Sequence, residues 1–387
     1  MLAAQSFAVP PTGRIEFGAG AVRRLPAALR LVGHERAFVV SDPGVRAAGV
    51  LDQVLVILAE AGIRTCVFAE VEPNPSVATL ASAVGPALEF GPAAVVPVGG
   101  GSSLDAAKGI ALLATHGGDL AVLDYGSEPS HPAPPLVAVP TTAGTGAETN
   151  GFGVIADPAG HRKIYIGHAS LTPRVAILDP ELTVGLPPAG TAATGTDALV
   201  HGVESLASLG RNPVSEAYAH QAVTLVHQWL PAAVADGTDL EARSRLLLGA
   251  HLAGLALTLS GLGLVHGIAH AVTAYTGAAH GIALAAVLEP VLRFNARGGT
   301  VDNYAGLAFD LGVGERGGST ERNAGAAIDE LRRVTEQVGS HTPLGALGCT
   351  EQLLPDLTRT ALADAVTGNN PRRPSPAQLT ELLRAAL

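Results

Sequence analysis

The chain carries, at residues 94–108, the stretch AVVPVGGGSSLDAAK. Its first five residues are apolar and predict a buried strand, while the alanine-rich residues after Ser102 predict a helix. The glycines between them let the backbone turn sharply and leave the first N–H groups of the helix facing an anion such as a phosphate. The same residues also fit a plain strand–helix turn, with Ser102 as N-cap and Asp105 completing a capping box. Both interpretations predict the same fold class.

Outward from this stretch, apolar runs that predict strands alternate with longer helical segments. The predicted strands are Ala37–Val40, Arg64–Phe68, Ala93–Val98 and Leu136–Val139, and the helices between them include Gly49–Ala61 and Val77–Phe90. This alternation is typical of a parallel sheet that is covered on both faces.

The pattern changes in the second half of the chain. Over Phe152–Leu178 the strand signals shorten, with a hairpin turn expected at Asp157–Gly160. After Pro187 they stop, and the pattern is helical from about Thr191 onward. We therefore expect an α/β domain with a parallel, Rossmann-like sheet over residues 1–185, followed by an all-helical domain over residues 186–387.

Composition excludes several classes of function. Of the 387 residues, 47% are hydrophobic and 15% are charged, so a large core can form. The net charge of −10, without a cluster of basic residues, argues against nucleic acid or an anionic membrane as partner. Cys66 and Cys349 cannot form a disulfide framework, and the opening residues MLAAQSFAVPPTGRIEFG lack the pattern of a secretory signal. We expect a cytoplasmic enzyme that acts on a small molecule.

The segment Leu246–Leu288 contains no Asp, Glu, Lys or Arg, which superficially suggests a membrane hairpin. Glycines interrupt it, however, and it carries four histidines, which are costly in lipid. We interpret it as buried helices at the centre of a domain.

Two further features point to a ligand at the edge of the sheet. Residues 140–150, PTTAGTGAETN, follow a predicted strand, so Thr141, Thr142 and Thr145 should lie at its carboxyl end, where α/β proteins bind ligands. Asp42 follows the first clear strand and precedes the glycines, which is not the ordinary dinucleotide fingerprint. It is either a ribose-binding acid or a turn residue before Pro43.

The most specific signal is a set of histidines and one aspartate. Asp197 and His201 are four residues apart in a helical stretch and project from one face, and His266 and His270 repeat this spacing. His280 follows shortly afterwards. One carboxylate with several imidazoles suits Zn²⁺ or Fe²⁺, although any single histidine here could instead be a hydrogen-bonded core residue.

With these residues the chain resembles the iron-containing (group III) alcohol dehydrogenase family, whose fold is related to dehydroquinate synthase and glycerol dehydrogenase. The resemblance covers nearly the whole chain. Its markers are GGGSSLDAAK at 99–108, PTTAGTGAE at 140–148, LDPELTVGLPP at 178–188, GTDALVHGVES at 195–205, GLGLVHGIAHAV at 261–272 and TGNNPRRP at 367–374.

The resemblance implies a role for each matching residue. The metal ligands would be Asp197, His201, His266 and His280, while His270 would assist proton transfer without binding the metal. The metal would be Fe²⁺, with Zn²⁺ as the alternative. The cofactor would be NAD, in preference to NADP, with Asp42 at the adenosine ribose. The other cofactor-binding residues would be Gly99, Gly100, Gly101 and Ser102 at the pyrophosphate, with Ser103, Thr141, Thr142, Thr145 and Lys163.

The implied activity is a metal-dependent NAD(H)-linked alcohol dehydrogenase, or an aldehyde or ketone reductase in the reverse direction. Hydride would pass between the nicotinamide and the carbon that bears the metal-bound oxygen. The alternatives are a maleylacetate reductase, which generally has Asn in place of Asp197, and a lyase of the dehydroquinate synthase type. Relatives acting on short diols often carry Phe and Asn where this chain has Leu257 and Leu259, and Phe152 stands where the residue is often polar. This difference favours a substrate other than a short diol.

We also expect a homodimer or larger homo-oligomer. Residues 13–18, GRIEFG, predict a strand ahead of the alternating pattern, and an orphan edge strand of this kind is often paired across a subunit interface.

Overall fold

The computed structural model describes residues 6–123, 127, 129–157 and 162–387. The chain divides into two compact units, one formed by Pro10–Leu186 and the other by Pro187–Leu387 together with the described residues before Pro10.

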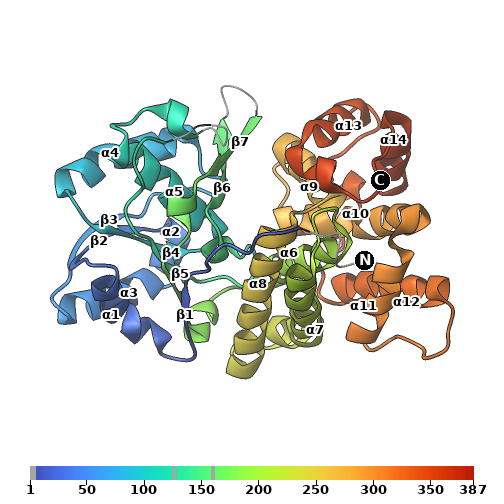
Figure 1. The fold of residues 1–387 in the computed structure, drawn as a ribbon, viewed down its shortest axis with the longest axis horizontal. Coiled ribbons are helices and arrows are strands. Elements are labelled where there is room, and N and C mark those ends of the chain that lie inside the picture. Colours follow the sequence, from blue (N-terminus) through green and yellow to red (C-terminus); the bar gives the residue numbers. More distant parts are fainter. Residues whose placement is uncertain (1–5, 124–126, 128, 158–161) are drawn as a thin grey trace. The chain divides into compact units, whose positions relative to one another are not determined.

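In the first unit, within the described residues, six strands form one sheet in the order β1-β8-β5-β4-β2-β3. Its strands lie in the blue-to-green part of the ribbon in Figure 1. Every neighbouring pair in this sheet is parallel, which confirms the sheet type expected from the strand–helix alternation. The strands are β1 Arg14–Phe17, β2 Arg36–Val40, β3 Arg64–Phe68, β4 Ala94–Gly99, β5 Val137–Pro140 and β8 Val175–Leu178.

Helices cover both faces of the sheet because successive strand residues point to opposite sides. Along β2, Phe38 and Val40 pack into one buried cluster and Ala37 and Val39 into the other. The first cluster also takes residues from α4 and α5, and the second takes residues from α1 and α3. The helices of this unit are α1 Leu25–Leu31, α2 Pro43–Ala47, α3 Val50–Glu60, α4 Val77–Phe90 and α5 Gly101–Thr115.

The order of the strands creates a switch point between β2 and β4. After β2 the chain passes to β3 on one side, and it then returns to β4 on the other side of β2. Ligands of open parallel sheets bind at the carboxyl ends of the strands at such a point. The loops that follow β2 and β4 begin with Ser41 and Gly100, so this is where Asp42 and the glycine turn meet.

A separate antiparallel pair, β6 Phe152–Asp157 and β7 Arg162–Gly167, corresponds to the expected hairpin. Its turn, placed at Asp157–Gly160 from the sequence, lies largely outside the described residues.

The first strand of the chain is not an orphan. Residues Arg14 to Phe17 pair in parallel with Val175 to Leu178 of β8 and form one edge of the sheet. The sequence alone could not show this, because the partner strand lies about 160 residues further along the chain. On the described part of the chain, the outer side of β1 has no strand beside it.

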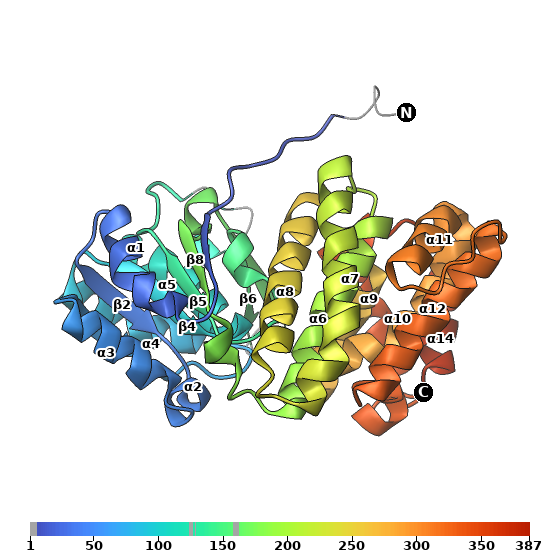
Figure 2. The same ribbon diagram turned by 90° about the horizontal axis from the view of Figure 1, so that it is seen from below.

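The second unit is built from helices. Helices α6, α7 and α8 pack side by side in both ribbon views (Figure 2). No single helix among the described residues is both long and apolar enough to cross a membrane, and only α8 and α9 taken together, bent by 105°, reach that length and composition. The helices are α6 Pro188–Ala207, α7 Pro213–Ala235, α8 Leu240–Ser260, α9 Leu264–Thr276, α10 His280–Asn295, α11 Val301–Asp310, α12 Thr320–Gln337, α13 Leu354–Ala363 and α14 Pro376–Ala385.

Candidate active site

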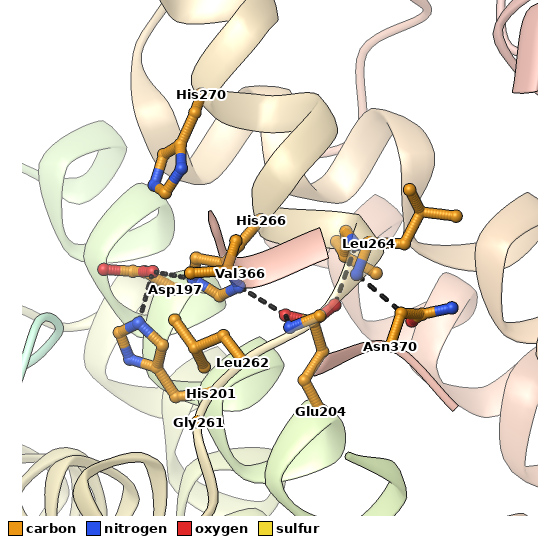
Figure 3. A network of polar contacts seen from close by, with 12 residues as sticks. Asp197, His201, Glu204, Gly261, Leu262, Leu264, His266, His270, Val366 and Asn370 are labelled. Atoms are coloured by element: carbon orange, nitrogen blue, oxygen red, sulfur yellow. Dashed lines mark hydrogen bonds and ion pairs between the residues drawn. The ribbon is translucent and has the colours of Figure 1, made fainter. Parts of the chain in front are cut away.

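In the helical unit, three imidazoles surround one carboxylate oxygen. Oδ1 of Asp197 lies 3.2 Å from Nε2 of His201, 3.4 Å from Nε2 of His266 and 3.8 Å from Nε2 of His280. Figure 3 shows Asp197 with His201 and His266 directed towards it from two sides. Asp197, His201 and His266 are buried, and His280 is partly exposed. The geometry thus brings together all four residues that the sequence suggested as metal ligands.

Helix geometry and close packing explain how these side chains meet. Asp197 and His201 lie one turn apart on α6, and His266 belongs to the first turn of α9. His280 is the first residue of α10, and the next residue, Gly281, contacts α6. A Cβ atom on Gly281 would lie 1.9 Å from the carbonyl oxygen of Ala193, so only glycine lets the start of α10 approach α6 this closely.

The donor set fits a bound cation. Oδ1 of Asp197 and Nε2 of His266 are buried and make no hydrogen bond. A buried polar atom that is left without any partner costs about 1–3 kcal/mol of folding free energy, and a bound cation would supply the missing partner. A tetrahedral ion with bonds of about 2.0–2.2 Å holds its donors about 3.3–3.6 Å apart, close to the separations given above. Imidazole and carboxylate donors suit Fe²⁺ and Zn²⁺.

The electrostatics of Asp197 and His280 support the same interpretation, whereas Glu204 and Asp197 outweigh the effect of burial on His266 and raise its pKa to about 9. Burial disfavours the charge on Asp197, yet the neighbouring histidines hold the pKa of this carboxyl well below its usual range. Desolvation lowers the pKa of His280 to about 3, and the nearby imidazoles contribute to this shift. His280 is therefore neutral at pH 7, as a metal ligand must be.

His270 lies one helical turn beyond His266 on α9 (Figure 3). Its ring stacks on that of His280 at a centroid distance of 5.3 Å, and its Nδ1 lies 2.9 Å from Oδ2 of Asp364. His270 was expected from the sequence, whereas Asp364, which lies 94 residues away along the chain, was not.

In the α/β unit, the glycine turn and the threonine loop are in contact. The backbone N–H of Thr141 donates to the carbonyl of Gly99 over 2.9 Å. Cβ atoms on Gly100 and Gly101 would lie 3.2 Å from Thr142 and 2.6 Å from Thr145, respectively. The glycines therefore let both threonine side chains reach the start of α5.

The start of α5 differs from the capping-box interpretation. Its N-cap is Gly100, no side chain caps the first turn, and Ser102 lies inside the helix. Asp105 instead accepts a hydrogen bond from the backbone N–H of Val154 over 3.0 Å. The first turn of α5 therefore keeps the N–H groups that an anion such as a pyrophosphate would bind.

Asp42 is both a helix cap and a neighbour of the glycine turn. Its Oδ1 accepts from the N–H of Val45 over 2.9 Å, which caps α2, and its Oδ2 accepts from Oγ of Ser103 over 2.8 Å. The turn interpretation of Asp42 is thus correct, but the carboxylate also faces the site rather than away from it. The backbone of Lys163 belongs to β7, and its side chain lies outside the described residues.

Two buried charged residues that organise these regions were missed from the sequence. Glu204 lies on α6 beyond Asp197 and His201 and contacts His266. Its spacing of seven residues from Asp197 repeats the helical period, and this signal could have identified it. Lys108 of α5 is fully buried and donates to the carbonyl of Ala147 in the threonine loop over 2.7 Å.

Known proteins resemble this chain along its whole length. The family model described as iron-containing alcohol dehydrogenase matches residues 11–180, and the model for the C-terminal part of the same family matches residues 191–387. The chain is 35% identical to an NAD-dependent methanol dehydrogenase of Bacillus methanolicus, covering 99% of this chain and all of that protein. It is 37% identical to a 1,3-propanediol dehydrogenase of Citrobacter freundii, covering 96% of each.

A solved structure of a 1,3-propanediol oxidoreductase superposes with a TM-score of 0.95 at 36% identity, covering 99% of this chain and all of that one. The matches span both units. The chain therefore belongs to the iron-containing alcohol dehydrogenase family.

Proposed function

We propose that the protein is a metal-dependent NAD(H)-linked alcohol dehydrogenase that also reduces the corresponding aldehydes or ketones. The observation that carries this proposal is the buried convergence of Asp197, His201 and His266, with His280 beside them. The NAD dependence named for the Bacillus methanolicus relative supports the choice of cofactor.

Asp197, His201, His266 and His280 would hold Fe²⁺, or Zn²⁺ in its place. When bound, such an ion polarises the oxygen of an alcohol or carbonyl and stabilises negative charge on it. Asp197 stays ionised because its neighbours lower its pKa, so the protein contributes one negative charge to the centre. The neutral imidazoles contribute lone pairs without further charge.

His270 is suited to move a proton. The contact with Asp364 occupies Nδ1, so a proton that His270 exchanges with the substrate would pass through Nε2. The Asp364 carboxylate also fixes the plane of the ring, as a carboxylate does in other histidine-based acid–base systems. His270 is therefore our candidate catalytic residue.

The α/β unit would bind NAD at the switch point of its sheet. The first turn of α5, from Gly100 to Ser103, offers backbone N–H groups to the pyrophosphate. Asp42 would accept hydrogen bonds from the adenosine ribose, because each carboxylate oxygen has a lone pair left after its contact with Val45 or Ser103. The remaining cofactor-binding residues would be Gly99, Thr141, Thr142, Thr145 and Lys163.

Two alternative activities receive less support. A maleylacetate reductase generally has Asn where this chain has Asp197, and the relatives described above are named as a methanol dehydrogenase and a 1,3-propanediol dehydrogenase. A dehydroquinate synthase-type lyase would need basic residues around an anionic substrate, whereas residues 246–288, which carry His266, His270 and His280, contain no Lys or Arg.

We further propose a cytoplasmic homodimer or larger homo-oligomer. Both cysteines are free, which fits a reducing compartment. Ile15 and Phe17 on the edge strand β1 are 41% and 40% exposed, and an apolar strand edge of this kind is well suited to pairing with a second copy.

The activity is tested with metal-stripped protein that is reloaded with Fe²⁺ or Zn²⁺ and assayed for NAD⁺ reduction with a panel of alcohols. We expect turnover only after loading. Full activity of the stripped protein, verified by elemental analysis, would contradict a metal-dependent reaction. Activity on a phosphorylated or carboxylated substrate without net NAD⁺ reduction would favour the lyase instead.

A further inference from the structure

Glu204 is a buried carboxylate on α6 whose hydrogen-bond partners all lie at the beginning of α9. Oε2 accepts from Nδ1 of His266 over 2.6 Å and from the N–H of Gly263 over 3.2 Å, and Oε1 accepts from the N–H of Val265 over 2.7 Å. The side chain of Glu204 is 5% exposed. A carboxylate is retained in such a place only where several donors replace its water.

The contact with Glu204 decides which nitrogen of His266 carries the proton. An ionised carboxylate only accepts hydrogen bonds, so Nδ1 of His266 must donate. In the neutral ring the lone pair is then on Nε2, the atom that lies 3.4 Å from Oδ1 of Asp197. In Figure 3 the ring of His266 lies between the side chains of Asp197 and Glu204.

Glu204 also helps to hold the start of α9. No side chain within α9 caps its N-terminus, and the N-cap residue is Gly263. Glu204 accepts from the N–H groups of Gly263 and Val265, and Oδ1 of Asn370 accepts from the N–H of Leu264 between them over 3.1 Å. Glu204 therefore shares with Asn370 the helical turn that carries His266, and it alone of the two also contacts the ring of His266.

We propose that Glu204 is a positioning residue of the metal centre, which holds His266 as an Nδ1-protonated ligand that binds the ion through Nε2. This inference rests on the proposed role of His266 as a ligand. A carboxylate in this position also raises the basicity of the imidazole, and loss of such a partner typically weakens metal binding by about 10- to 100-fold.

The test measures metal affinity rather than turnover. Purified wild type and Glu204→Gln are titrated with Zn²⁺ in competition with a chromophoric chelator. The amide cannot accept from all three donors, so we expect the affinity to fall by about 10- to 100-fold. Thermal unfolding of both proteins checks that the variant is folded.

The chain offers a matched control. Nε2 of His227 and Oε1 of Glu330 are also 2.6 Å apart and partly buried, and they join α7 to α12 without contact to the four proposed ligands. Glu330→Gln alters this carboxylate–imidazole contact, together with the hydrogen bonds that Glu330 accepts from Arg333, and should retain wild-type metal affinity. An equal loss in both variants would overturn the proposal, because it would reflect general destabilisation.

The proposal and the ligand assignment can fail separately. If His266→Ala retains full Zn²⁺ affinity, the ligand role of His266 is wrong. If His266→Ala loses the metal while Glu204→Gln binds it as tightly as wild type, only the role of Glu204 is wrong.

A measurement on the wild type covers the case in which Glu204→Gln does not fold. Nitrogen NMR of the Zn²⁺-loaded, ¹⁵N-histidine-labelled protein, with the signal of His266 identified by its loss in His266→Gln, distinguishes the two ring nitrogens. We expect a protonated Nδ1 and a metal-bound Nε2. A metal-bound Nδ1 would overturn the proposal.

Discussion

Replacement of Lys108 by Met tests how the cofactor loops are held together. The ammonium group of Lys108 is fully buried and donates to the carbonyls of Ala147 and Phe152 and to Oδ1 of Asn150. These acceptors belong to the threonine loop and to the start of β6, so one side chain ties α5 to both. Burial lowers the pKa of Lys108, although Asp105 at 3.8 Å opposes this shift.

The expected loss of stability follows from these contacts. Hydrogen bonds from a charged donor contribute about 1.5–3 kcal/mol each, so three of them contribute roughly 5–9 kcal/mol before the cost of burial. Burial of the ammonium group costs several kcal/mol, which offsets much of that sum. Met has a similar length and leaves little cavity. We therefore expect Lys108→Met to lower the free energy of unfolding by about 3 kcal/mol.

Two assays separate the structural and the functional effect. With a urea slope of about 2 kcal/mol/M, the unfolding midpoint followed by circular dichroism should fall by about 1.5 M. The fluorescence of Trp229, which lies in α7, reports the helical unit separately. NAD⁺ binding to the folded variant should weaken about tenfold, because binding must then also order the threonine loop, and every 1.4 kcal/mol of binding free energy is a factor of ten in affinity.

The control is Arg64→Met, which removes one positive charge from an exposed position on β3 of the same unit. It should change neither the midpoint nor NAD⁺ affinity. Wild-type stability and NAD⁺ affinity in Lys108→Met would refute the reasoning. A loss of the same size in Arg64→Met would assign the effect to charge rather than to the buried contacts.

Four further outcomes are expected. His266→Ala should bind no metal and be inactive, whereas wild type binds one ion per chain; elemental analysis that finds the ion retained in the variant would contradict this. Asp42 should favour NAD(H), because a 2′-phosphate at ~4 Å adds a repulsion of about 1 kcal/mol in water and more in a desolvated site; an unchanged ratio of the two specificity constants in Asp42→Gly would show that preference is set elsewhere. Phe17→Glu on β1 should shift a dimer towards monomer in light scattering, and a wild type that is already monomeric would dismiss the interface. The hydrogen bond to Asp310 raises the pKa of His220 above 6.5, so the stabilisation from this pair is complete below pH 6.5 and is lost as the pH rises through the raised pKa. The melting temperature of His220→Gln should therefore fall below that of wild type at low pH, by a difference that narrows at high pH. A difference that stays constant with pH would contradict this.

Features that depend on local geometry could be predicted from the amino-acid sequence. The strand–helix alternation around residues 94–108 predicted a parallel sheet, because period-two and helical patterns follow from backbone geometry alone. The spacing of Asp197 and His201 placed both on one face of a helix for the same reason. Family motifs then extended these local patterns to the site, where the structure brings His266 and His280 beside Asp197.

Which side chains far apart in the sequence form hydrogen bonds depends on the tertiary structure. Glu204 and His266 are 62 residues apart, and His270 and Asp364 are 94 apart; no local period relates them. β1 pairs with β8, which lies far along the chain. The first turn of α5 has no side-chain cap, although the local sequence allowed one. These contacts are set by how whole helices and strands pack. Lys108 shows the same limit, because both its burial and its acceptors follow from the packing of α5 against the threonine loop.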